Sequence, residues 1–113
     1  MSPRGETLLW LAQRASGALL AVLVLVHLAT MIYAVQNGLS AGEILGRTRG
    51  SLGWAVFYGL FATAAAVHAP IGLRNVIAEW TPWRGRSLGW AMLALGLLLA
   101  VLGFRATWAV VAG

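Results

Sequence analysis

The sequence predicts an all-α integral membrane protein, a three-helix bundle in up-down-up order that forms a single transmembrane domain over residues 1–113. The chain is 60% hydrophobic and only 10% charged, and a small domain cannot hide such an apolar excess from water. Three stretches carry no charge, 15–35, 52–73 and 87–104, and each is close to the roughly 20 residues that cross about 30 Å of hydrocarbon. We therefore expect helices at about 8–36, 51–79 and 87–111.

The first expected helix, 8–36, leads into a polar loop that begins at Asn37-Gly38, a helix stop followed by turn chemistry. Its apolar region is too long for a secretory signal, and no small-x-small cleavage pattern follows it. We therefore expect this helix to remain on the mature protein.

The second expected helix, 51–79, contains Pro70. Proline removes a backbone hydrogen bond and bends a helix, although membrane helices also tolerate it without a special role. Thr81-Pro82-Trp83 then separates this helix from the third, 87–111. Glycines that favour close helix approach lie on or near the third helix: Gly85, Gly89, Gly96 and Gly103.

The charges indicate an orientation. The eight basic residues, all arginine, outnumber three glutamates and give a formal net charge of +5. They lie between apolar blocks and not along one polar face, which argues against a nucleic-acid partner. Five of them fall in the N-terminal segment and the second loop, so the positive-inside rule predicts an inner (cytoplasmic) membrane protein with a cytoplasmic N-terminus. The chain has no cysteine, so it holds no iron–sulfur cluster by thiolates.

Two histidines, His27 and His68, fall inside expected membrane spans. An imidazole in hydrocarbon needs a hydrogen-bond partner on a neighbouring helix or a metal to coordinate, and the residue type alone leaves both alternatives open. For His68 the helical period places Gly72, Asn75 and Glu79 on the same stripe. Gly72 leaves space for a flat macrocycle, and Asn75 offers a hydrogen bond to a propionate, so this stripe predicts a haem wall.

The segment 68–79, HAPIGLRNVIAE, resembles the His-x3-Gly-x-Arg-His-x3-Asp signature of the cytochrome b556 anchor subunit of succinate dehydrogenase. The resemblance implies that His68 is an axial ligand of haem b, in an environment that includes Gly72 and Arg74. Asn75 stands where the family has its second histidine, and Glu79 stands where it has aspartate.

A second match is the segment 13–17, QRASG, which is similar to the family's His-Arg-x-Ser-Gly entry into the first helix. It implies a quinone site, for ubiquinone or menaquinone, formed by Arg14 with Trp10 and Ser16. Trp10 replaces the family's quinone-contacting serine. Gln13 replaces its propionate-binding histidine and would join the haem environment.

The two histidines lie at different distances from the arginines that mark one membrane boundary. At about 1.5 Å per residue, His68 is roughly 9 Å from Arg74 and His27 is roughly 20 Å from Arg14. We therefore expect that they do not bind the same iron. His27 either ligates a second haem or is a structural histidine bonded across a helix interface, and each haem needs its other axial ligand from another chain.

The resemblance implies a non-catalytic subunit of a succinate:quinone oxidoreductase, one part of a larger heteromeric helical bundle. Its expected partners are a flavoprotein, an iron–sulfur subunit, and a second anchor chain or a second copy of this one, together with quinone and the lipid bilayer. Two alternatives remain at this point. One is a non-redox membrane scaffold or small transporter subunit, and the other is a subunit of a different b-type cytochrome.

Overall fold

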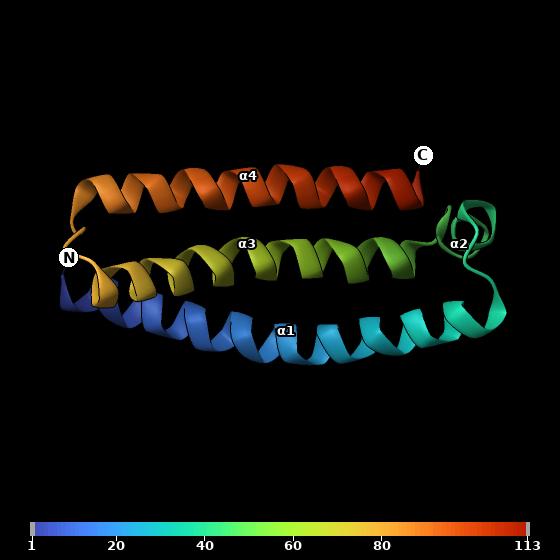
Figure 1. Ribbon diagram of the computed structural model, residues 1–113, viewed down its shortest axis with the longest axis horizontal. Helices are drawn as coiled ribbons and strands as arrows, with labels where there is room; N and C mark the ends of the chain where they lie inside the picture. The colour runs from blue at the N-terminus through green and yellow to red at the C-terminus, as the bar shows by residue number, and fades with distance from the viewer. Residues whose placement is uncertain (1, 113) are drawn as a thin grey trace.

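The computed structural model describes residues 2–112, and within them it contains four helices and no strand. These are α1 (Pro3–Asn37), α2 (Ala41–Thr48), α3 (Leu52–Trp80) and α4 (Arg86–Val111). The three long helices run antiparallel in sequence order, with α3 between α1 and α4 (Figure 1). All three are long and apolar enough to cross a membrane. The expected up-down-up membrane bundle is therefore confirmed, and the chain is a multi-pass membrane protein.

The observed ends of α3 and α4 lie within one residue of the expected positions, but α1 begins five residues earlier than expected. Ser2 is the cause, because its side chain accepts a hydrogen bond from the backbone N–H of Gly5 at 3.1 Å. Pro3 follows at the first helical position, where its missing N–H costs nothing. The N-terminal segment therefore extends α1 beyond its apolar part.

The expected polar loop at 36–50 contains a helix that the sequence interpretation missed, α2. Ser40 caps it by accepting a hydrogen bond from the N–H of Glu43 at 3.2 Å, and the Ser40 hydroxyl donates to the Glu43 carboxylate at 2.7 Å. A serine followed three residues later by glutamate, before apolar Ile44 and Leu45, is a capping signature. That signature was the available signal for this helix.

Residues at the end of α2 and just after it form hydrogen bonds with the C-terminal end of α4. The Thr48 hydroxyl donates to the carbonyl of Val110 at 2.6 Å, and the Gly50 N–H donates to the carbonyl of Val111 at 2.7 Å. The last carbonyls of a helix have no partner within that helix. The α1–α3 connection therefore supplies hydrogen-bond donors to two of the last carbonyls of α4, those of Val110 and Val111.

Close packing of α3 against α4 depends on two glycines. A Cβ atom at Gly103 would lie 2.6 Å from the Cβ of Ala62, and one at Gly96 would lie 3.1 Å from the carbonyl oxygen of Ala66. That carbonyl is the one that Pro70 leaves without its helical N–H donor. By contrast, a Cβ at Gly89 would meet nothing within 4 Å, so close helix packing does not require this glycine.

Helix α1 presents one narrow stripe to α3. The residues of α1 that are buried or half-buried recur at alternating spacings of three and four, and they include Gln13, Ser16, Leu20, Leu23, His27 and Thr30. This is the spacing of helices that pack at a small crossing angle. The remaining faces of α1 are mostly exposed and apolar, as suits contact with lipid or with further helices. The polar residues of the span therefore face α3.

Candidate functional site

The imidazole of His68 lies against α1, in the half of the bundle that carries the N-terminus. Its Nδ1 is 3.4 Å from the Oγ of Ser16, a residue with only 7% of its surface exposed. A Cβ atom at Gly17 would lie 3.2 Å from the Cε1 of His68. The backbone of α1 can approach the ring this closely because Gly17 carries no side chain.

The hydrogen bonds of Ser16 suit one tautomer of His68. The Ser16 hydroxyl donates to the backbone carbonyl of Gln13 at 3.2 Å, and a hydroxyl has a single proton to donate. With the ring proton on Nδ1, the Ser16 oxygen accepts from Nδ1–H of His68 and the lone pair resides on Nε2. No described residue provides a hydrogen bond to Nε2. A neutral imidazole in this tautomer can ligate a metal through Nε2.

A cavity of about 400 Å³, here called the arginine cavity, lies one helical turn farther toward the N-terminal end. It is lined by residues of α1 and α3: Glu6, Leu9, Trp10, Gln13, Arg14, Ile71, Arg74 and Asn75. The guanidinium of Arg14 lies 5.1 Å from the centre of the Trp10 ring, within range of a cation–π interaction. The structure thus places Trp10 and Arg14 of the predicted quinone site around one cavity with Gln13, Arg74 and Asn75 of the predicted haem environment. Ser16 and Gly72 do not line it.

Gly72 and Gln13 meet at the edge of this cavity. A Cβ atom at Gly72 would lie 3.1 Å from Nε2 of Gln13, so the space that Gly72 leaves is taken by the amide of Gln13 in this chain. The other amide atom, Oε1, is the one buried side-chain oxygen or nitrogen without a hydrogen-bond partner among the described residues. A buried amide oxygen without a hydrogen-bond donor lowers the stability of the fold. A bound group with a donor could satisfy this oxygen.

The residues in this region fit a haem in two respects. Nε2 of His68 has no hydrogen bond from a described residue, and the arginine cavity one turn away holds Arg14 and Arg74, whose positive charge suits carboxylates such as propionates. His68 does not line the arginine cavity, nor either of two cavities that border His27 in the opposite half of the bundle. A macrocycle on this histidine would therefore be covered by a second chain and not enclosed by this one.

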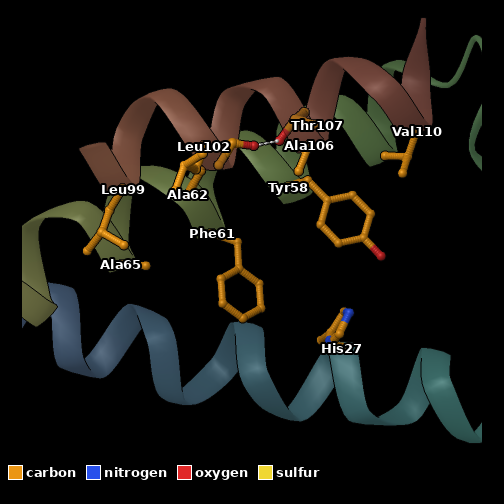
Figure 2. A pocket seen from close by; sticks show the side chains of 11 residues that line it. His27, Tyr58, Phe61, Ala62, Ala65, Leu99, Leu102, Ala106, Thr107 and Val110 are labelled. Carbon is orange, nitrogen blue, oxygen red and sulfur yellow. Dashed lines mark hydrogen bonds between the residues drawn. The ribbon is translucent and has the colours of Figure 1, made fainter. Parts of the chain in front are cut away.

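His27 lies in the opposite half of the bundle, between two aromatic side chains of α3 (Figure 2). Its ring meets Tyr58 edge-on at 5.9 Å between centroids and Phe61 at 5.7 Å. The sequence interpretation did not assign a role to these two aromatic residues. A signal was available, because the aromatic residues of this segment follow a helical spacing that predicts a cluster on one side of α3: Trp54, Phe57, Tyr58 and Phe61.

His27 borders a cavity of about 620 Å³ between α1, α3 and α4, here called the His27 cavity. The Thr30 hydroxyl donates to the backbone carbonyl of His27 at 2.7 Å and not to its ring. No described residue forms a hydrogen bond with the His27 imidazole. The interhelical bond that would make it a structural histidine is therefore absent from the described part of this chain.

The two histidines lie at different depths, as the sequence predicts. His68 is level with Ser16 and Gly17, whereas His27 is ten residues beyond Gly17 on α1. Ten residues of helix correspond to about 15 Å along its axis. The two rings therefore cannot ligate one iron atom.

The described residues contain no cluster of three or more histidine, cysteine or acidic side chains that could hold a metal ion.

The chain was compared with known protein families, curated proteins and solved structures. Residues 1–104 match the family described as succinate dehydrogenase/fumarate reductase transmembrane subunit. No curated protein and no solved structure gave a match. The family match covers the first two membrane helices and most of the third. The chain therefore belongs to the family of succinate dehydrogenase/fumarate reductase transmembrane subunits.

Proposed function

We propose that this transmembrane subunit is a haem b-binding anchor of a succinate:quinone oxidoreductase, with His68 as one axial ligand. The observation that carries the proposal is the state of the His68 ring. Its Nδ1 is bonded to Ser16, its Nε2 has no partner among the described residues, and the arginine cavity lies one turn away. When bound, the haem supplies a one-electron redox couple whose potential the surrounding protein tunes.

The arginine cavity is the proposed quinone and propionate site. Arg14 would stabilise negative charge that develops on a quinone oxygen during reduction, while the Trp10 ring beside it provides a flat apolar wall. Arg74, Asn75 and Gln13 line the same cavity from its haem side and would bind propionates through charge-assisted or amide hydrogen bonds.

The catalytic chemistry belongs to partner chains in this proposal. A flavoprotein would handle the dicarboxylate, and an iron–sulfur subunit would pass electrons to quinone near Arg14. The second axial ligand of the haem would come from another anchor chain or from a second copy of this one. The excess of arginine at the N-terminal end supports a cytoplasmic N-terminus in the inner membrane, with the soluble subunits docked on that side.

His27 supports a second haem in the opposite half of the bundle. Its imidazole has no hydrogen-bond partner in the described part of the chain, and it borders the His27 cavity. An unpaired imidazole at membrane depth is costly, so a ligand or a partner chain must satisfy it. A pyridine haemochrome assay that gives two haems per complex would support the second haem, and one haem per complex would reject it.

The experiment for the main proposal is a pyridine haemochrome measurement on the purified native complex, with His68→Ala and His27→Ala compared. We expect His68→Ala to remove the b-type spectrum of the haem nearer the N-terminus and His27→Ala to leave that signal in place. A colourless wild-type complex would instead support a non-redox scaffold. A spectrum that survives His68→Ala would assign the axial ligand to another residue.

A further inference from the structure

We propose that Ser16 is a positioning residue for His68, whose hydroxyl holds the imidazole in the Nδ1–H tautomer and leaves Nε2 available to iron. This inference rests on the proposed function, because it concerns the residue that would ligate the haem. It gives Ser16 a different role from the quinone contact that the sequence resemblance implied. Ser16 is also absent from the lining of the arginine cavity.

The geometry supplies the first step. The Oγ of Ser16 lies between two groups, the carbonyl oxygen of Gln13 at 3.2 Å and Nδ1 of His68 at 3.4 Å. If the hydroxyl proton pointed to Nδ1, the ring would carry its own proton on Nε2 and could not coordinate a metal through Nε2 in that tautomer. A serine within a helix commonly donates to the carbonyl three or four residues earlier, and the Gln13 carbonyl lies within reach of Oγ. We infer that the proton points there and that the oxygen accepts from the ring.

Burial supplies the second step. Ser16 is one of two buried polar residues in the described chain, with 7% of its surface exposed. Solvent or lipid headgroups therefore compete little for its hydroxyl, and low local polarity strengthens the hydrogen bonds that it makes. The hydrogen bond between Ser16 and His68 thus lies within the α1–α3 interface of this chain.

The space beside Gly17 supplies the third step. A Cβ atom at Gly17 would lie 3.2 Å from Cε1 and 3.5 Å from Nδ1 of His68. The ring therefore occupies the space that a side chain at Gly17 would take, and it lies within reach of Ser16 there. Gly17 makes room for the imidazole, and Ser16 accepts its hydrogen bond.

A hydrogen bond from Nδ1–H makes an axial imidazole a stronger electron donor and favours the more oxidised metal. Loss of the acceptor should raise the midpoint potential of the haem bound to His68 and loosen its retention about 10-fold, the lower end of the range for such supporting residues. A role confined to packing would change neither quantity when a side chain of similar shape is present.

The test uses the whole complex with Ser16→Ala, Ser16→Thr and, as a control, Thr63→Ala. Thr63 is an exposed residue of α3 whose hydroxyl bonds only to the carbonyl of Gly59 in its own helix. The measurements are the redox titration of the b-type absorption band and the low-spin ferric EPR signal. We expect a higher midpoint potential and an altered EPR signal for Ser16→Ala, near-wild-type behaviour for Ser16→Thr, and no change for the control.

The outcomes separate the two proposals. A wild-type complex without haem overturns the proposed function and this inference with it. A wild-type haem whose potential, EPR signal and retention are all unchanged in Ser16→Ala overturns only this inference. If Ser16→Ala does not assemble, Ser16→Cys replaces it, because sulfur nearly preserves the volume and is a weaker acceptor. An upward shift of potential in that variant supports the role of Ser16, and an unshifted potential contradicts it.

Discussion

Gly72 of α3 and Gln13 of α1 form a matched pair in which the missing side chain of one makes room for the amide of the other. A Cβ atom at position 72 would lie 3.1 Å from Nε2 of Gln13, and Oε1 of the same amide is buried without a partner. The sequence alone assigned Gly72 to the haem surface and Gln13 to a propionate. In the fold, the side chain of Gln13 lies against the backbone of Gly72.

Gly72→Ala should therefore displace the Gln13 amide and destabilise the subunit by only about 1 kcal/mol, the lower end of the cost of overpacking, because the added methyl meets only the end of a flexible side chain. The measurement is thermal unfolding of the complex in detergent, together with its haem content. Gly89→Ala is the matched control, since a Cβ there meets nothing within 4 Å and alanine is the better helix former. Equal unfolding temperatures for both variants would show that Gln13 does not need the space at Gly72.

Gly103→Ala should loosen the contact between α3 and α4. The new methyl would lie 2.6 Å from the Cβ of Ala62, so the helices must separate, at a cost of about 1–3 kcal/mol. The measurement is a denaturant titration in mixed micelles as part of a double-mutant cycle with Ala62→Gly. The second change removes the obstructing atom and should recover much of the loss. If the effects of the two substitutions on the free energy of unfolding are simply additive, the cost of Gly103→Ala does not come from contact with Ala62.

Arg14→Gln should impair quinone reduction without affecting the soluble chemistry of the complex. Removing one charge stabiliser of this kind commonly costs about 100-fold or more in rate, so we expect a large fall in succinate–quinone activity with dye-coupled succinate oxidation preserved. Arg105→Gln, near the far end of α4 and outside the arginine cavity, is the control. A parallel fall in both activities would indicate a loss of assembly and not of the quinone site.

Thr48→Val should fray the C-terminal end of α4. The Thr48 hydroxyl donates to the carbonyl of Val110, and loss of a donor to a part-buried acceptor costs about 1–3 kcal/mol. We expect faster amide hydrogen exchange over the last turn of α4. Thr81→Val is the comparison, because that exposed hydroxyl bonds mainly within its own helix end. Unchanged exchange in Thr48→Val would mean that the Gly50 N–H holds this end by itself.

The three membrane spans follow from the sequence because crossing hydrocarbon is a local requirement. Each backbone polar group must be satisfied within its own segment, so an uncharged stretch of sufficient length implies a helix wherever it lies in the chain. The ends of α3 and α4 were predictable for the same reason. Helix α2 was missed because its eight residues include only two large apolar side chains, and its stability depends on contact with α4.

The candidate residues were also readable from the sequence, since His68, Arg14 and their neighbours form two short motifs on single helices. Which of them meet depends on how α1 packs against α3, and that register is set by side chains from both helices together. Only the tertiary structure brings Ser16 to Nδ1 of His68 and places His27 between Tyr58 and Phe61. The physical reason is that helix formation is decided by one segment, whereas interhelical contacts are decided by the complementary shapes of two.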